Sequence, residues 1–551
     1  MLETIHHHQL YVSSIDHSIS CVSIPFTHPE RTHSFLSVQT ASGGLCHKCG
    51  PLYNQALAAG PGPGPRAGPS SRGKGRASDA AVLASASGDI SGVNGKKQPI
   101  PRMKRTIIER PQDKKVLPTL QGMCINIISH YIEDVEALGG IGDRNIDNLS
   151  KSISKNRRLN PQTLQLFLEP ETESLTLYDC SSLTSDSLKT IPVFCPRLHT
   201  INLQRCGQLD NAAFDTWSDK LQDLRRLELF GPYLVRAESW KRFFEASGGR
   251  LESLKLRETP RLDLGCIKSL VANCPDLTQL GLAQIGQLDG PCLDELQQLK
   301  SLTYLDVSDP GVSAPGIPPE GLKDNEVINL LAAIGSKLRY LNLSGNSDLT
   351  DRVLLEGILP HCHSLQELHL AFLDKISSDA LKIVFDSFDA RGLPRLTHVE
   401  LRRCSQVEDD CLDALVQHSG PALQILSLNS CNKLTGDGTK TVVGEDGAAV
   451  RVDGDRADNP VGVTTGRSSP SPPLYQGLRS IANHCQDLKE LDLAFVRSCG
   501  DGEIMSLVEG CPQLEKIKVY GCNRISDYVA GTTRCQVIGL ERVPLIAKNV
   551  A

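Results

Sequence analysis

One short pattern of apolar residues recurs through most of the chain and constrains its fold more than any other feature. The clearest copy is Leu198-His-Thr-Ile-Asn-Leu-Gln-Arg-Cys206, which has the form L-x-x-L-x-L-x-x-C with Ile201 in the second apolar position. Twelve copies occur, and the first six begin 25 to 27 residues apart. Their first positions are Thr172 (a weaker opening copy), Leu198, Leu224, Leu251, Leu277, Leu302, Leu338, Leu365, Leu396, Leu423, Leu488 and Leu514. This pattern and period are typical of a leucine-rich repeat.

The spacing of the apolar positions predicts a strand in each repeat. Side chains alternate along a strand, so the two apolar positions of L-x-L point to the same face. One repeat cannot bury that face alone, whereas stacked repeats form a continuous core with strands on the concave side. We therefore expect residues 171–535 to form an α/β leucine-rich-repeat solenoid, a right-handed horseshoe of about twelve repeats. Leu280 and Leu368 should lie in its core.

The segment after each strand carries the signals of a helix. In one repeat, Ser377 or Ser378 is a suitable N-cap and Asp379 makes the first turn acidic. The apolar residues that follow at helical spacing are Leu381, Val384 and Phe385. We expect such helices to cover the outside of the strands.

Cysteines recur at two fixed positions of the repeat. The chain has 19 cysteines. Those three positions after the last strand anchor are Cys180, Cys206, Cys404, Cys431 and Cys522, and those three positions before a repeat's first anchor are Cys195, Cys274, Cys362, Cys485 and Cys511. Repetition at one structural position predicts small buried thiols rather than disulfides, which implies a reducing compartment.

Composition and motifs favour a binding protein over an enzyme or a membrane protein. Apolar residues make up 40% of the chain, and no uninterrupted apolar run approaches the roughly 18 residues that span a bilayer. The chain lacks a phosphate-binding glycine loop and a Gly-x-Ser-x-Gly motif. The histidines in or near repeat turns, expected to be structural, are His361, His363, His418 and His484. We predict no enzymatic activity.

Residues 1–60 contain one candidate metal motif, Cys46-His-Lys-Cys49 followed by Gly50. A Cys-x-x-Cys turn directs two thiolates at one metal, but a structural zinc site needs four ligands. No second Cys-x-x-Cys lies nearby. Cys46 and Cys49 are therefore either a degenerate zinc-finger remnant that binds zinc or a pair of unliganded cysteines.

Residues 61–116 are predicted to be a disordered basic linker. The segment is rich in Gly, Pro and Ser, which cannot form a core. It carries 12 Lys and Arg against 4 Asp and Glu, a net charge of +8, whereas the whole chain carries −6. Lys96-Lys97, Met103-Lys-Arg105 and Lys114-Lys115 are candidates for nuclear import or for phosphate contacts, and a solvated linker is the alternative.

Residues 117–170 lack the repeat pattern and are predicted to form three short helices. Apolar residues recur at helical spacing through the first of them, from 117 to 138. Such a module can cap the first repeat, and it can also dock a partner because its apolar surface exceeds one stripe. The candidate partner-binding residues are Leu117, Leu120, Ile127 and Tyr131.

Three irregularities interrupt the repeats. Residues 230–250 concentrate aromatic residues that we expect to fill the convex core. Residues 308–323 lengthen one repeat to 36 positions. Residues 435–472 are an insertion rich in Gly, Asp and Ser-Pro, predicted to be disordered.

Three strings outside the repeat consensus resemble fungal DNA repair proteins of the Rad-seven type. They are Ile132-Glu-Asp-Val-Glu-Ala-Leu-Gly-Gly-Ile-Gly-Asp-Arg-Asn-Ile146, Ser154-Lys-Asn-Arg-Arg-Leu-Asn-Pro-Gln-Thr-Leu-Gln-Leu-Phe167 and Gly231-Pro-Tyr-Leu-Val-Arg-Ala-Glu-Ser-Trp-Lys-Arg-Phe-Phe244. The similarity covers about residues 100–530 and, weakly, 43–58. Family members carry a second Cys-x-x-Cys, which is missing here.

The resemblance implies a nuclear, non-catalytic factor of global-genome nucleotide excision repair. Its implied partners are an SNF2-type ATPase with a RING finger (the Rad-sixteen type), an elongin-C-like adaptor and a cullin, with which it acts as a ubiquitin ligase. Damaged DNA or chromatin would be reached through that complex, and no membrane is involved.

Two other interpretations use the same repeats. An F-box substrate receptor would place residues 117–167 on a different adaptor, and its Leu-Pro opening is present as Leu117-Pro118, although the pattern that follows is poor. A GTPase activator would need a catalytic residue on a repeat loop and often has an acidic tail, but residues 544–551 are not acidic.

Overall fold

The structure is a computed structural model that describes residues 119–311, 321–435, 440–443, 449–452 and 477–540. The chain divides into two compact units, Met1–Pro118 and Thr119–Ala551, and every described residue belongs to the second. The predicted metal motif at Cys46 and Cys49, the predicted linker 61–116 and Leu117 therefore lie outside the described residues.

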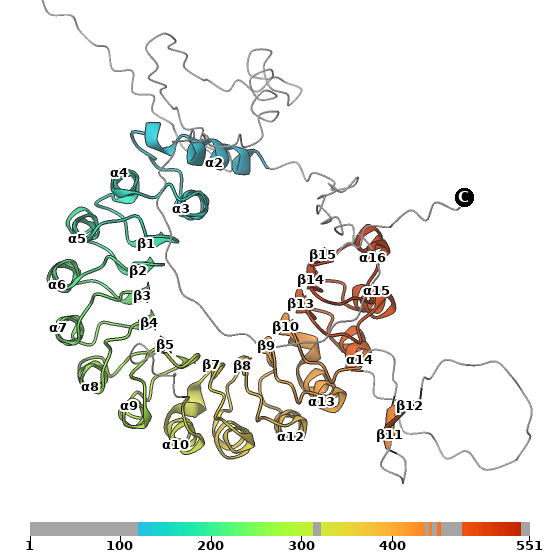
Figure 1. Ribbon diagram of the computed structural model, residues 1–551. Helices are drawn as coiled ribbons and strands as arrows, with labels where there is room; N and C mark the ends of the chain where they lie inside the picture. The colour runs from blue at the N-terminus through green and yellow to red at the C-terminus, as the bar shows by residue number, and fades with distance from the viewer. Residues whose placement is uncertain (1–118, 312–320, 436–439, 444–448, 453–476, 541–551) are drawn as a thin grey trace, which may run out of the picture. The chain divides into compact units, whose positions relative to one another are not determined.

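The repeats form one parallel sheet of 13 strands, with one strand per repeat (Figure 1). The strands are β1 (Ser174–Leu177), β2 (Thr200–Leu203), β3 (Arg226–Phe230), β4 (Ser253–Arg257), β5 (Gln279–Ala283), β6 (Tyr304–Asp306), β7 (Tyr340–Asn342), β8 (Glu367–His369), β9 (His398–Glu400), β10 (Ile425–Ser427), β13 (Glu490–Asp492), β14 (Lys516–Lys518) and β15 (Gln536–Ile538). The predicted leucine-rich-repeat solenoid is confirmed, with the strands at the L-x-L positions.

The register of the sheet stacks equivalent apolar positions on one another. Leu280 of β5 pairs with Leu254 of β4 and Leu305 of β6, and Leu368 of β8 pairs with Leu341 and Val399. Leu280 and Leu368 are both fully buried, as predicted. One column of branched side chains therefore runs through the core of the solenoid.

Helices cover the outer side of the strands in the described unit (Figure 1). They are α5 (Ser185–Phe194), α6 (Asn211–Lys220), α7 (Ala237–Ser247), α8 (Leu264–Asn273), α9 (Gly290–Leu296), α10 (Asp324–Ile334), α11 (Leu359–His361), α12 (Ser378–Ala390), α13 (Asp409–Ser419), α14 (Gly477–His484), α15 (Asp501–Gly510) and α16 (Asp527–Thr532). Ser377 is the N-cap of α12, and its hydroxyl accepts from the Ala380 amide at 3.1 Å. The short helical turns are η3 (Gly335–Lys337), η4 (Val353–Ile358) and η5 (Gly420–Ala422).

Apart from Cys124, the cysteines of the described residues are buried free thiols. Several of the thiols donate to a backbone carbonyl of the preceding repeat, such as Cys404 to Leu370 at 3.0 Å and Cys431 to Leu401 at 3.1 Å. Burial raises the pKa of the Cys404 thiol to about 12. These cysteines are therefore neutral packing groups, as the sequence predicted.

The aromatic residues of 230–250 fill the convex core, which confirms the expectation. Trp240, Phe243 and Phe244 of α7 are buried, and the rings of Trp240 and Phe214 lie 4.6 Å apart. This cluster fixes α6 and α7 to each other.

The structure corrects the predicted repeat region in two places. The insertion 435–472, expected to be disordered, contains an antiparallel pair, β11 (Lys440–Val443) and β12 (Ala449–Val452). These two segments are rich in β-branched residues, which favour strands. The composition around them, rich in Gly and Pro, was the reason to expect disorder. The repeats also continue past the expected end at 535, because β15 pairs with β14.

The N-terminal part of the described unit is helical, as predicted, with α2 (Leu120–His130), α3 (Asp143–Lys155) and α4 (Pro161–Leu164). The turns η1 (Ile132–Asp134) and η2 (Gln165–Phe167) complete it. The first helix ends at His130 rather than continuing toward 138, because the chain turns to bury Ile132 and Leu138. None of the helices in the described ranges is long and apolar enough to cross a membrane.

Candidate functional site

The helices α2 and α3 form a layer against the first strand of the sheet. The Ser150 hydroxyl of α3 donates to the Thr176 carbonyl of β1 at 2.8 Å, and Tyr178 donates to the Asp147 carboxylate at 2.7 Å. Helix α2 packs on α3, and Ser152 donates to Ser129 at 2.9 Å. The module thus covers the end of the sheet with α3 and holds α2 on top of it.

Helix α2 keeps an apolar stripe toward solvent. Leu120, Ile127 and Tyr131 are 43%, 45% and 39% exposed, and Cys124 is partly exposed. These four residues stand at i, i+4, i+7 and i+11, which is one face of a helix, and we call them the α2 stripe. Three of the four predicted partner-binding residues, Leu120, Ile127 and Tyr131, thus share a face, and Leu117 lies outside the described residues. Cys124 belongs to the same helical series of apolar residues in the sequence but was not among the predicted partner-binding residues.

A cavity with a mixed polar and apolar lining lies in the module. This cavity of about 430 Å³ is lined by η1, η2 and the end of α5, and includes Ile132, Val135, Leu166 and Phe194. Phe194 is 47% exposed. The α2 stripe is therefore the apolar surface that the module turns to solvent, while α3 contacts β1.

The concave face carries a row of rings that the sequence analysis missed. Tyr304, Tyr340, His369 and His398 come from β6, β7, β8 and β9, and we call them the concave row. Their successive ring centroids lie 4.0, 4.8 and 4.6 Å apart. All four occupy positions next to a core anchor, so alternation along the strand turns them away from the core. Aligning the repeats would have shown the row, because a Tyr or His stands beside the core anchor in four successive repeats.

The concave row extends to a lysine at one end. The Lys255 ammonium of β4 lies 4.0 Å from the centre of the Tyr304 ring, a cation–π distance. It crosses over Gly281 of β5, where a Cβ atom would come within 3.3 Å of the Lys255 side chain. Burial, followed by the charge of Asp306, raises the pKa of Tyr340 to about 12. The Tyr340 hydroxyl is thus a neutral hydrogen-bonding group on this face.

Two glutamates flank the histidines of the concave row. The Glu400 carboxylate lies 3.0 Å from Nδ1 of His369, and this hydrogen bond lowers the pKa of Glu400. Burial, together with the neighbouring His369, lowers the pKa of His398. Glu367 of β8 lies opposite His398 in the sheet. Three of these side chains, Glu367, His369 and His398, lie close enough together to hold a metal ion.

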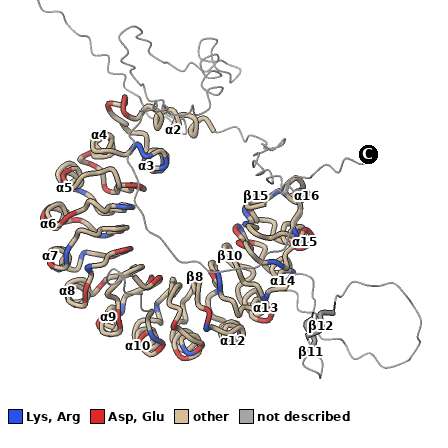
Figure 2. The backbone as a smooth tube through the Cα atoms, viewed as in Figure 1, with Lys and Arg blue, Asp and Glu red and all other residues tan. Residues whose placement is uncertain are grey.

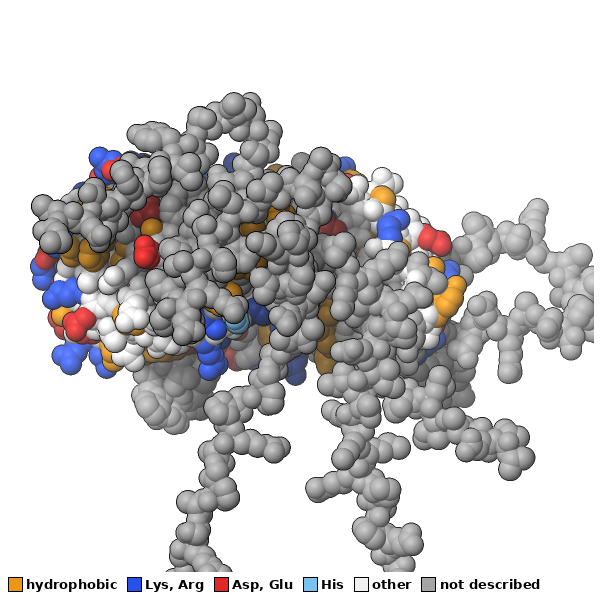
Figure 3. Space-filling model, turned by 90° about the horizontal axis from the view of Figure 1, so that it is seen from above, with side chains coloured by type: hydrophobic (Ala, Val, Ile, Leu, Met, Phe, Trp, Pro, Cys, Tyr) orange, Lys and Arg blue, Asp and Glu red, His pale blue; other side chains and the backbone are white. Residues whose placement is uncertain are grey.

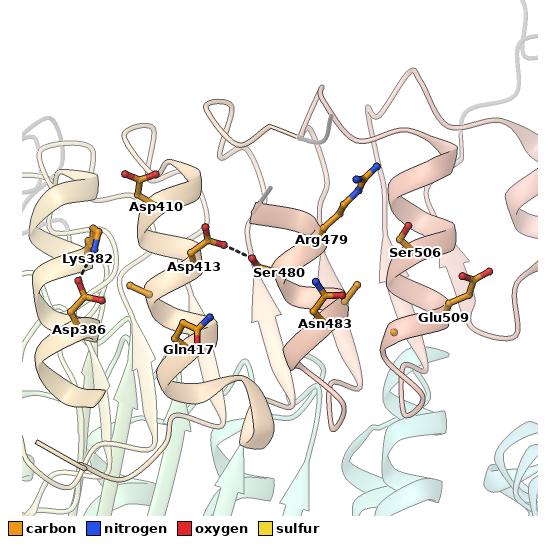
Figure 4. Close-up of a pocket in the computed structure, with 13 residues that line it drawn as sticks. Lys382, Asp386, Asp410, Asp413, Gln417, Arg479, Ser480, Asn483, Ser506 and Glu509 are labelled. Carbon is orange, nitrogen blue, oxygen red and sulfur yellow. Dashed lines mark hydrogen bonds and ion pairs between the residues drawn. The ribbon is translucent and has the colours of Figure 1, made fainter. Parts of the chain in front are cut away.

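The outer helices enclose an open polar pocket of about 900 Å³ (Figure 4). It extends over α12, α13, α14 and α15. Two pairs of its polar groups contact each other: Lys382 lies 2.6 Å from Asp386, and Ser480 donates to Asp413. Burial raises the pKa of Asp413. Lys and Arg alternate with Asp and Glu along the described chain (Figure 2), and the described side chains visible on one face include both charges and apolar groups (Figure 3).

These features define a leucine-rich-repeat protein of the recognition or scaffold class, with an exposed apolar stripe at one end and a ring-lined concave face. No family model matches the chain. The DNA repair protein rhp7 of Schizosaccharomyces pombe is 33% identical over 440 residues, which cover 80% of this chain and 69% of the relative. The DNA repair protein RAD7 of Saccharomyces cerevisiae is 31% identical over 452 residues, covering 77% and 71%. The chain therefore belongs to the Rad7 family of DNA repair proteins, and the resemblance seen in the sequence is confirmed.

A solved structure agrees with this assignment. The crystal structure of the Rad7 and Elc1 complex in yeast matches with a TM-score of 0.60 and 30% identity, covering 76% of this chain and 92% of the solved one. The F-box and GTPase-activator alternatives are set aside in favour of the Rad7 family.

Proposed function

We propose that this chain is a non-catalytic recognition subunit of nucleotide excision repair in the nucleus, attached to an elongin-C-type adaptor through its N-terminal helical module. The observation that carries the proposal is the α2 stripe. Four residues on one face of α2 remain accessible although the opposite face, with Ile128, packs inward. An apolar helix face of this kind fits a groove on a partner. The yeast relative was crystallised with Elc1, which supports an elongin-C-type partner.

The wider assembly is proposed from what the family resemblance implies. We propose that an SNF2-type ATPase with a RING finger and a cullin complete a ubiquitin ligase, and that damaged DNA or chromatin is reached through this assembly. The concave row is the surface we assign to recognition, since solenoids of this type bind through their concave side. We also expect Cys46 and Cys49 to bind zinc substoichiometrically, because the matching pair of ligands is missing.

The decisive test of the module is the double variant Leu120→Asp/Ile127→Asp. We expect it to lose co-purification of the elongin-C-type adaptor from nuclear extract and to raise ultraviolet sensitivity in cells, because two charges would enter an apolar contact. The matched control is Ile383→Asp, which changes a residue 47% exposed on α12 and should keep both properties. Circular dichroism and thermal melting establish that each variant is folded.

The outcomes separate the parts of the proposal. A folded double variant that keeps the adaptor and repairs ultraviolet damage normally shows that the module only caps the sheet. Mass spectrometry of the co-purifying chains tests the ATPase and the cullin independently, since either can be absent while the adaptor is retained.

A further inference from the structure

Parallel pairing of β8 and β9 brings two glutamates and two histidines together on the concave face. Glu367 is opposite His398, and His369 is opposite Glu400. The anchors between them, Leu368 and Val399, point into the core. The other four side chains consequently share the opposite face of the sheet.

Three of these side chains direct ligand atoms at one point. Oε2 of Glu367 lies 3.9 Å from Nε2 of His369 and 3.6 Å from Nδ1 of His398. All three ligand atoms lie within 4.8 Å of one another. In a tetrahedral set with metal bonds of about 2.0–2.1 Å, ligand atoms stand roughly 3.3–3.5 Å apart. Small side-chain rotations therefore bring the three atoms to bonding distance of one ion.

His369 provides an independent observation that points to a ligand. His369 is 6% exposed, and its Nε2 atom is buried without a hydrogen-bond partner. The Glu400 carboxylate, 3.0 Å from Nδ1, can only accept a hydrogen bond, so in the neutral ring the proton sits on Nδ1 and Nδ1–H donates to Glu400. Nε2 then presents a lone pair toward Glu367 and His398. A buried acceptor left unpaired costs about 1–3 kcal/mol, and a metal ion would satisfy it.

We propose that Glu367, His369 and His398 bind a divalent transition-metal ion of the zinc class, and that Glu400 is a positioning residue that orients His369. Two imidazole nitrogens and one carboxylate suit zinc or cobalt, whereas magnesium and calcium prefer an all-oxygen set. A carboxylate behind a ligating histidine is the usual second partner of such sites. Three protein ligands leave a fourth position, which opens on the concave face and can take water or a donor from a bound segment.

The test uses the full-length chain with Cys46→Ser and Cys49→Ser, so that the N-terminal thiols cannot contribute. Cobalt(II) titration should saturate at one equivalent with d–d absorption and no thiolate-to-cobalt charge-transfer band, and zinc(II) should displace the cobalt. Added zinc(II) should also raise the midpoint of thermal unfolding, because it binds only the folded state. Saturation failure, or a thiolate band, would overturn the proposal.

Substitutions of two proposed ligands and of the positioning residue make this test more specific. His398→Ala and Glu367→Gln change partly exposed residues and should abolish saturable binding, whereas Glu400→Gln should weaken it about 10–100-fold. The matched controls, His361→Ala and Glu356→Gln, lie outside the cluster and should bind as the parent does. Thermal melts without metal confirm folding. If His398→Ala and Glu367→Gln retain one equivalent, or if His361→Ala loses it, the concave row is a packed stripe and the metal binds elsewhere.

Discussion

The second apolar anchor of each repeat forms an unbroken column from Leu175 in β1 to Val537 in β15. Each anchor is flanked by two residues that face the concave side. The strand register therefore sets both the core contacts that hold the repeats together and the residues presented for binding. A substitution at an anchor alters packing in the core, whereas a substitution at a flanking position alters the concave surface. Stability and binding are thus separable at neighbouring positions.

Some links between repeats outside the sheet are made by single carboxylates. Asp409 at the start of α13 accepts from the Thr435 amide at 3.0 Å and from its hydroxyl. Gly477 leaves the space for this contact, since a Cβ atom there would lie 2.6 Å from Oδ1 of Asp409. Burial raises the pKa of Asp409 to about 6, against the lowering effect of the Thr435 hydrogen bonds.

This pKa predicts a pH-dependent contribution to stability. Between about pH 4 and pH 6 the folded state keeps a proton on Asp409 that the unfolded chain has lost. The contribution of Asp409 is thus complete below about pH 4 and declines as the pH rises through 6. We expect the difference in unfolding free energy between the wild type and Asp409→Asn to fall by about 1–3 kcal/mol from pH 4 to pH 7. Urea melts at both pH values measure it, and a difference that grows with pH would contradict it.

The role of a residue can be predicted from the sequence when its partners lie at a fixed and short spacing along the chain. Leu280 and Leu368 were predicted as core residues because their partners recur at a fixed period. Glu367, His369 and His398 were missed because they vary from repeat to repeat and their partners lie 31 residues away in sequence. Leu120, Ile127 and Tyr131 could be predicted as one exposed face because helical spacing is itself local, and their role in partner binding stays a prediction. Cys46 and Cys49 stay a prediction.

At the level of elements, strand positions followed from the sequence but several boundaries did not. The first helix ends at His130 because burial of Ile132 and Leu138 outweighs the apolar spacing that continues beyond it. The segment Val353–Ile358 is a π-helical turn, just before Pro360, which cannot donate a backbone hydrogen bond. Neither tertiary burial nor the missing backbone N–H of a proline can be predicted from the spacing of apolar residues.

The cap of α12 links two repeats, and its removal should be measurable. The Ser377 amide and hydroxyl both donate to the Asp351 carboxylate at 2.7 Å, while the hydroxyl accepts from Ala380. Ser377→Ala leaves the Ala380 amide without its cap and removes one bond to Asp351. We expect a loss of about 1–2 kcal/mol in chemical denaturation.

The neighbouring hydroxyl provides the control for this cap. Ser378→Ala changes the first residue of α12, which is outside the N-cap position. It removes the acceptor of the Glu408 amide, 3.2 Å away, but leaves the cap of α12 intact, so its loss should be smaller than that of Ser377→Ala. Equal losses in the two variants would show that the cap is not what stabilises the helix start.

At the scale of the whole solenoid, cohesion is a sum of contacts between neighbours. Each strand of the 13-stranded sheet pairs only with the strands before and after it, and the helices follow the same order. The insertion after Thr435 does not break this order, because β10 pairs directly with β13. A disturbance should therefore spread along the stack and weaken with distance.

Leu368→Ala tests this locality, with Leu280→Ala as the same change three strands away. Both side chains are fully buried, so each truncation should cost roughly 2–5 kcal/mol. Hydrogen exchange followed by mass spectrometry should show protection lost first in β7, β8 and β9 for Leu368→Ala, and in β4, β5 and β6 for Leu280→Ala. The exposed Ile383→Ala is the control and should leave exchange unchanged. A cost below about 1 kcal/mol would place the two leucines outside the core, and a uniform loss of protection in both variants would show that the solenoid unfolds as one cooperative unit rather than repeat by repeat.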